Sequence, residues 1–505
     1  MRLEPFAHDP MPNPVAGGAK LDDVLALNAR RRPDEPALFD PALPFDGAWR
    51  EVDRAVSALA EVFSHWRLGE DAVVGVQLGS RFEGALTCLA LWRAGLIPAM
   101  LPIAWRRRET ARALATVGAA AVVAATEAGG AALAEIACEI AAGLDTLRFV
   151  GSFGDASPDG ATPLDEALTL EAGGSPLAER PDDAADHIAI ITFEAGGAPA
   201  PRSHNDLVAA CLTPLLAAQL TDRSKLLSTL DLGGLAGLAT GLAPWLTTGA
   251  VACFHQPSTT AAFAAAAEGL GATHIALPGR AADRLIADGA LGETTPEAVI
   301  AVWRAPDGGG AAKSFNLDGA IVVDAIMIGE LGVFAAARPS EHRHAALPLG
   351  RHAPEGLDAL IDLRVLQDGR LFVRGPACPQ AAFPAAPGAP ALPFAADGYI
   401  ETGLAGIADR VAGRATLGGR RRGVAQIGGL AVSSAETLAA AMATGLPGGL
   451  EIEDDALFGS RLALTLSEDS KPFSAEQAAT ILEAAGFGPA LAPAIVRAEP
   501  SRRTA

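Results

Sequence analysis

Residues 186–207 read DHIAIITFEAGGAPAPRSHNDL and decide how the rest of the chain is interpreted. An apolar run, Ile188 to Ile191, leads through Thr192 into a glycine-rich turn, and a polar segment precedes a second apolar run from Leu207. This order predicts a strand, a small-residue loop and a helix. Such a loop can hold phosphate oxygens, because glycine lets backbone N–H groups point inward and the next helix presents its positive end. An ordinary glycine-rich connection is the alternative, and the loop alone does not choose between the two.

Composition narrows the class of protein. The chain has 505 residues, half of them apolar, which is enough for roughly two to four domains with ample cores. Its net charge of −20 argues against a nucleic-acid partner, because phosphate binding requires an excess of Lys and Arg. The five cysteines show no CxxC spacing, so neither a disulfide framework nor a zinc site is expected. No signal peptide and no membrane span are expected, and we therefore predict a cytoplasmic protein.

The N-terminal part alternates between strand and helix patterns. Three short apolar runs between residues 72 and 125 predict buried strands, with helices predicted over residues 82–94 and 109–117. This alternation predicts right-handed crossovers and a parallel sheet. The basic run Arg106 to Arg108 is interpreted as a solvated helix start.

A second motif lies near the end of the chain, where residues 397–403 read DGYIETG and the pair Gly419-Arg420 follows. Thr192, Gly197 and Pro199 of the first loop are spaced as in a Thr-Ser-Gly-Thr-Thr-Gly-x-Pro-Lys-Gly phosphate loop. Together the two stretches resemble the motifs of the adenylate-forming superfamily, the acyl-CoA synthetases and their relatives.

The resemblance covers nearly the whole chain, from residue 21 to residue 503, and implies an α/β fold. Two doubly wound, mostly parallel sheets and a small β subdomain would form an AMP-binding domain over residues 1–420. A small α+β lid domain would occupy residues 421–505, joined near residues 419–423 by a glycine-arginine hinge.

The resemblance also implies a chemistry, in which ATP activates a carboxylic acid to an acyl-adenylate that is transferred to coenzyme A, as in fatty acid metabolism. ATP, Mg²⁺ and coenzyme A are the implied cofactors, and a small-molecule carboxylic acid or acyl group is the implied partner. A homodimer is compatible with the resemblance. Glu330 takes the position of the family's magnesium-binding, catalytic glutamate. The residues implied in nucleotide binding are Thr192, Gly196, Gly197, Thr402 and Arg420.

Four positions depart from the family's motifs. Glu194 stands where the phosphate loop has glycine, Ala200 where it has lysine, and Leu404 where an aspartate bonds the ribose hydroxyls. No lysine follows Lys471, whereas the family's lid ends in a catalytic lysine. A carboxylate that faces a triphosphate costs about 1 kcal/mol at roughly 4 Å in water, and more in a partly dry site.

Two hypotheses follow. The first is an acyl-CoA synthetase, and the second is a catalytically impaired homologue that binds an acyl group, an acyl-thioester or a protein partner. The second predicts that ATP binds no more tightly than about 1 mM. If the site has merely decayed, Glu194→Gly, Ala200→Lys and Leu404→Asp together should restore nucleotide affinity.

Overall fold

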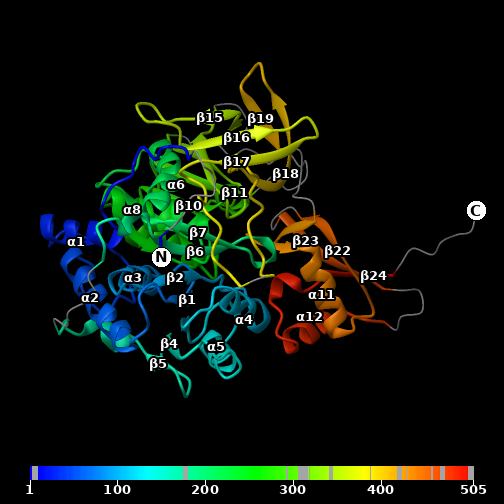
Figure 1. Cartoon of the computed structure of the whole chain (residues 1–505), viewed down its shortest axis with the longest axis horizontal. Helices are drawn as coiled ribbons and strands as arrows, with labels where there is room; N and C mark the ends of the chain where they lie inside the picture. Colours follow the sequence, from blue (N-terminus) through cyan, green and yellow to red (C-terminus); the bar gives the residue numbers. More distant parts are fainter. Residues whose placement is uncertain are drawn as a thin grey trace, which may run out of the picture.

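The computed structural model describes the chain except at residues 3–9, 174–179, 292–293, 305–316, 318, 340–344, 387, 418–422, 428, 456–458, 467–471 and 499–505. Figure 1 shows the chain running from blue N-terminal helices through cyan and then green elements to the yellow strands β16 and β17. It ends in the orange and red C-terminal elements, which lie beside α4.

The first sheet arises from the predicted strand–helix alternation. Within the described residues it has seven strands in the order β5-β4-β3-β1-β2-β6-β7. All neighbours pair in parallel except β7, which is antiparallel to β6. The predicted parallel sheet is therefore confirmed. Its strands are β1 (Val73–Gln77), β2 (Ile97–Met100), β3 (Ala121–Ala125), β4 (Phe149–Phe153), β5 (Thr162–Pro163), β6 (Ile188–Phe193) and β7 (Pro199–Ser203).

Helices connect and cover this sheet. The start of α4 is set by Glu109, whose carboxylate accepts the backbone N–H of Arg106 at 3.1 Å and so satisfies a donor that the first helical turn leaves free. Arg106 itself is only 6% exposed, so the prediction of a solvated start is wrong for this residue. The elements are α1 (Leu21–Arg31), α2 (Trp49–His65), α3 (Phe82–Arg93), α4 (Arg107–Thr116), α5 (Leu133–Ala141) and the short 3₁₀ turns η1 (Asp165–Thr169), η2 (Ala184–Asp186) and η3 (Ala195–Gly197).

The second sheet has six strands in the described residues, in the order β13-β12-β11-β10-β8-β9, and only β13 is antiparallel to its neighbour. Its strands are β8 (Lys225–Ser228), β9 (Val251–Phe254), β10 (His274–Pro278), β11 (Ala298–Arg304), β12 (Ile321–Met327) and β13 (Val333–Ala337). Its helices are α6 (His204–Ala217), α7 (Leu235–Gly237), the π-turn η4 (Leu238–Leu242), α8 (Ala243–Thr248), α9 (Thr260–Leu270) and α10 (Gly279–Ala287).

A β subdomain and a small C-terminal unit follow. The β subdomain is an antiparallel sheet of β14 (Leu347–Pro348), β15 (Gly350–His352), β16 (Ile361–Val365), β17 (Arg370–Arg374), β18 (Ile400–Asp409) and β19 (Arg414–Leu417). The C-terminal unit contains β20 (Val424–Ile427), β21 (Leu430–Ser433), α11 (Ser434–Thr444), β22 (Gly448–Asp455), β23 (Gly459–Leu466), α12 (Ala475–Ala484), η5 (Pro489–Leu491) and β24 (Ile495–Ala498). The predicted fold class is confirmed. The predicted boundary at residue 420 lies outside the described residues and stays a proposal.

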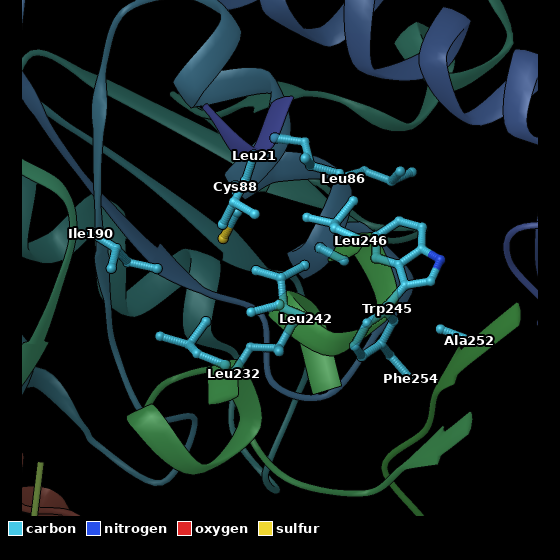
Figure 2. Close-up of a cluster of buried hydrophobic side chains, with 14 of the residues drawn as sticks. Leu21, Leu86, Cys88, Ile190, Leu232, Leu242, Trp245, Leu246, Ala252 and Phe254 are labelled. Atoms are coloured by element: carbon cyan, nitrogen blue, oxygen red, sulfur yellow. The ribbon is translucent and has the colours of Figure 1, made fainter. Parts of the chain in front are cut away.

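One apolar cluster joins the two parallel-rich sheets. Figure 2 shows Leu242 and Trp245 of the second sheet's helices lying beside Leu86 and Cys88 of α3. Trp245 is fully buried and stacks on Trp49 with ring centroids 5.7 Å apart. Each buried aromatic of this size contributes several kcal/mol to stability. The loop after β6 and the turn between β12 and β13 are therefore anchored on one common core. Throughout the described part of the chain, no helix combines the length and the apolar character needed to cross a bilayer.

Candidate functional site

The glycine-rich loop is a tight turn between two antiparallel strands. After β6 the chain turns at η3 and returns as β7, which places Thr192 opposite Ala200. Gly196 and Gly197 have φ angles of 82° and 84°, a region that favours glycine because it has no Cβ. The Gly197 N–H donates to the Glu194 carbonyl at 2.9 Å and so closes the turn, and the predicted role as a phosphate loop stays a prediction.

Helix α6 does not follow this turn directly. It begins at His204, after β7, and Ser203 and Asp206 cap it reciprocally with bonds of 3.0 and 3.1 Å. The expected order of strand, loop and helix is wrong at this point, because the proline-rich segment pairs as a strand instead. The helix N-terminus is satisfied by its own side chains and does not serve the loop.

The Glu194 carboxylate occupies the loop that precedes Gly196. Its Oε1 accepts the N–H of Ala195 and its Oε2 accepts the N–H of Glu330, both at 2.8 Å. The residue is only 5% exposed. Glu194 thus accepts one N–H from its own loop and one from the turn between β12 and β13. Its carboxylate is therefore an anion already bound beside backbone N–H groups of the kind that a phosphate loop uses.

Arg202 lies beneath the same turn and is completely buried. Its Nη1 donates to Thr192 Oγ1 at 3.4 Å, and its Nη2 donates to the backbone carbonyl of Glu330. Burial lowers the pKa of Arg202, while the neighbouring Glu330 carboxylate opposes that change. Thr192, predicted as a nucleotide contact, accordingly has its hydroxyl engaged in an internal bond.

Glu330 follows β12, as its match to the family's glutamate predicted, and it sits 6% exposed beside the loop. Its Oε2 accepts the N–H of Leu235 at 2.6 Å, and its Oε1 accepts from Arg304 Nη1 at 3.1 Å. A magnesium ion prefers oxygen ligands and would be repelled by the guanidinium already bound there. No group of three or more His, Cys, Asp and Glu side chains in the described residues could hold a metal ion. The Glu330 carboxylate could bind Mg²⁺ only if its pair with Arg304 separated, and the predicted catalytic and metal role of Glu330 stays a prediction.

Thr402 and Leu404 lie on β18, in the strand that carries the second motif. The Thr402 hydroxyl donates to the Leu371 carbonyl at 2.9 Å and accepts the Leu404 N–H at 3.1 Å, so it bonds the sheet itself. Leu404 is 2% exposed and Ala200 is fully buried, and both belong to one apolar cluster of the β subdomain. Two of the changed positions are thus parts of one hydrophobic core.

The structure brings some of the predicted site residues together. Glu194 and Arg202 connect the loop that contains Thr192 to Glu330. The Thr402 hydroxyl, by contrast, bonds to β17 and to its own strand. Arg420 lies outside the described residues. Sequence reasoning missed Arg202 and Arg304. A signal for Arg202 was present, because an arginine between two apolar runs must find buried partners.

These features define a class. The fold of the adenylate-forming ligases consists of two parallel-rich sheets on a common core, a β subdomain and a small C-terminal unit, and here a glycine-rich turn lies beside the turn that carries Glu330. The sequence profile of the AMP-binding enzyme family matches residues 25–366, and the chain belongs to this family.

Individual relatives cover only parts of the chain. Salicyl-AMP ligase / salicyl-S-ArCP synthetase of Mycobacterium tuberculosis is 31% identical over 255 residues, which are 49% of this chain and 45% of that protein. Long-chain fatty acid transport protein 1 of Mus musculus is 30% identical over 172 residues, 34% of this chain and 26% of that protein. The match thus spans less than half the length of either curated relative.

Solved structures resemble almost the entire chain. Apo MbtA of Mycobacterium smegmatis has a TM-score of 0.68 at 22% identity and covers 98% of this chain and 96% of its own. The amide bond synthetase McbA of Marinactinospora thermotolerans has a TM-score of 0.73 at 16% identity, covering 96% of each chain. These identities show a shared fold.

Proposed function

We propose that this protein is a member of the adenylate-forming ligase family that binds an acyl group or an acyl-thioester without activating it through ATP. The observation that carries the proposal is the Glu194 carboxylate, which accepts the N–H groups of Ala195 and Glu330. A phosphate that entered this loop would have to displace the Glu194 carboxylate from both N–H groups and would meet its negative charge in a site where Glu194 is only 5% exposed. Two like charges roughly 4 Å apart repel by about 4 kcal/mol near a protein surface.

The core of the β subdomain supports the same proposal. The family's motif has an aspartate at this position that bonds the ribose hydroxyls, whereas Leu404 belongs to an apolar cluster with Ile328 and Leu331. Ala200 is in that cluster too, so no cation reaches the loop from this position. Leu404 therefore offers no acceptor to a ribose, and Ala200 offers no donor to a phosphate. Each of these two hydrogen bonds, if present with one charged partner, would contribute about 1.5–3 kcal/mol.

Neither ATP nor Mg²⁺ fits the described site without rearrangement of Glu194 and of the Arg304–Glu330 pair, so we derive no step through them. The competing proposal is an acyl-CoA synthetase that transfers the acyl group to coenzyme A. It requires both carboxylates to leave their present partners. A cytoplasmic location and a homodimer remain further proposals from the sequence.

Pyrophosphate exchange and calorimetry separate the two proposals. The wild type should catalyse no ATP–pyrophosphate exchange with a panel of carboxylic acids, and ATP with Mg²⁺ should bind no more tightly than about 1 mM. Glu194→Gly frees two N–H groups and should tighten ATP binding by about tenfold, since a bond to a charged group contributes about 1.5–3 kcal/mol. Glu194→Gln keeps the side-chain volume but removes the charge and one of the two acceptor oxygens, so its ATP affinity should lie between those of the wild type and Glu194→Gly. Exchange activity or micromolar ATP binding by the wild type would refute the proposal.

Acyl binding needs its own measurement. Thermal unfolding of the wild type should shift upward with an acyl-thioester or a free acid when no nucleotide is present, because a ligand that binds only the native state stabilises it. Failure of every acyl ligand, together with absent exchange, would leave the protein-partner alternative and reject the acyl-binding part.

A further inference from the structure

Arg304 is a largely buried arginine whose guanidinium is only partly used by the protein. Its side chain is 17% exposed, and its Nη1 donates to Glu330 Oε1 at 3.1 Å. Neither its Nε nor its Nη2 donates a hydrogen bond to any residue that the structure describes. We call this side of the guanidinium the open edge of Arg304. Because a guanidinium carries five N–H donors, the open edge leaves several of them for water or a ligand.

A second arginine beside the same sheet shows how a structural arginine uses this edge. The side chain of Arg338 is 5% exposed, and its Nε and Nη2 donate to the Asp324 carboxylate at 3.1 and 2.6 Å. An arginine holds a carboxylate well in this way, because two N–H groups on one edge match its two oxygens. Arg304 presents the same edge, and no carboxylate of the described chain bonds it.

The position of Arg304 in the fold is one at which ligands bind. Arg304 is the last residue of β11, Glu330 follows β12, and Asp231 follows β8. These strands and β10 run in parallel, so their carboxyl ends lie at one edge of the second sheet. Ligands of open parallel sheets bind in the crevice outside the carboxyl ends of the strands. The open edge of Arg304 therefore lies where a ligand is expected.

The neighbouring acid Asp231 does not fill the open edge. Its Oδ2 accepts the N–H of Ile103 at 3.0 Å, and its Oδ1 accepts the N–H of Gly233 at 2.7 Å. Burial raises the pKa of Asp231, against the two N–H groups and the charge of Arg304. Since backbone N–H groups already bond both oxygens of Asp231, the open edge is left to an anion from outside the chain.

Glycine flanks the guanidinium on two sides. A Cβ on Gly234 would lie 3.4 Å from Arg304 Nη2 and 3.1 Å from Glu330 Oε1. A Cβ on Gly429 would lie 3.8 Å from Arg304 Nε. A side chain at either position would contact the open edge, so the two glycines keep side chains away from it.

We propose that the open edge of Arg304 binds a free carboxylate of the acyl ligand. This inference rests on the proposed function and narrows its ligand. The ligand is either an acid anion or a thioester that carries a free carboxylate elsewhere in its acyl chain, and a neutral acyl-thioester lacks the group that Arg304 binds. Arg304 can hold this carboxylate while its Nη1 stays on Glu330, because the guanidinium has separate edges for the two partners.

Calorimetry and thermal unfolding of the full chain test the charge requirement. The probes are straight-chain carboxylates of several lengths, their neutral ethyl thioesters, and half-thioesters of dicarboxylic acids of matched length. Neutral thioesters should bind at least about tenfold more weakly than the better of the two charged probes, because they lack the charge-assisted bonds to Arg304. Whether the simple acid or the half-thioester binds more tightly identifies the source of the carboxylate.

Two variants test the role of Arg304 itself. Arg304→Lys keeps a positive charge beside Glu330 but has no planar edge, so the affinity for the charged probe should fall by about tenfold. Gly234→Ala adds a Cβ beside Nη2 at a φ of −151°, which alanine adopts, and should weaken the same probe without any change of charge. Arg410→Lys makes the first substitution at an exposed position of the β subdomain and is the matched control. Urea midpoints establish that each variant is folded, and Gly234→Ala carries the test if Arg304→Lys is not.

The outcomes separate this inference from the proposed function. Equal affinity of the wild type for charged and neutral probes would overturn the carboxylate site and leave acyl binding in place. Unchanged affinity for the charged probe in both variants would likewise overturn the role of Arg304. Binding of none of the probes would reject the inference together with the acyl-binding part of the proposed function, whereas the ATP part is decided separately by pyrophosphate exchange.

Discussion

Leu404→Asp is the substitution that restores the family's ribose-binding residue, and the structure predicts that it disrupts the core instead. Leu404 is 2% exposed within the apolar cluster of the β subdomain. Loss of a buried leucine costs about 1.5–3 kcal/mol. A buried carboxylate has its pKa raised by about 3 units or more, which costs about 4 kcal/mol near neutral pH. The sum of about 6 kcal/mol is a large part of a typical unfolding free energy of about 5–15 kcal/mol.

The assay is urea unfolding followed by circular dichroism at several pH values. Because the raised pKa favours the protonated form in the folded state, the loss of stability should be smaller near pH 4 than near pH 7. Ile407→Asp is the matched control, since Ile407 lies on the same strand with 70% of its surface exposed and should change stability little. The reasoning is refuted if Leu404→Asp is as stable as Ile407→Asp at neutral pH, or if it binds ATP tightly. Either result would mean that the ribose position is open.

Three further predictions concern buried polar groups. Burial raises the pKa of Asp206 from 3.8 to about 7. The contribution of Asp206 to stability is therefore complete below pH 3.8 and is lost as the pH rises through 7. In urea titrations across that window, the unfolding free energy of Asp206→Asn should rise relative to that of the wild type by up to about 4 kcal/mol. Thr402→Val leaves the Leu371 carbonyl without its donor and should lower the unfolding free energy by about 1–3 kcal/mol, whereas an unchanged midpoint would show that the hydroxyl is dispensable. Arg338→Met removes a guanidinium 2.6 Å from the fully buried Asp324 and should cost about 3–5 kcal/mol at neutral pH; a stable variant would mean that the other donors suffice.

Local patterns predicted the strands at the centre of the first sheet. Short apolar runs separated by amphipathic segments placed β1, β2, β3 and the helices between them to within a few residues, because burial on both faces leaves a distinct composition. Resemblance to the family's motif, and not an apolar pattern, is what predicts the position of Glu330 after β12. The proline-rich segment after the loop was less informative, since its pairing as β7 depends on the partner strand.

The site itself could not be predicted in full, because its contacts join residues far apart in the chain. The carboxylate of Glu194 reaches a backbone N–H 136 positions away, at Glu330. From the sequence, Glu194 could be recognised only as a charge unfavourable to phosphate. That the loop bonds this charge follows from the three-dimensional course of the turn. The same holds for Arg108 at the start of α4, whose Nε donates to the Ala485 carbonyl 377 positions further along the chain.

The two hydrogen bonds that Glu194 accepts bear on how nucleotide concentration would affect the stability of the protein. A native protein that binds a nucleotide is stabilised in proportion to the logarithm of the nucleotide concentration, and its abundance then follows energy supply. The Glu194 carboxylate holds the N–H groups of Ala195 and Glu330 at a fixed effective concentration, since this acceptor is part of the chain. Under the proposed function, the unfolding midpoint of the protein should therefore be the same with and without ATP.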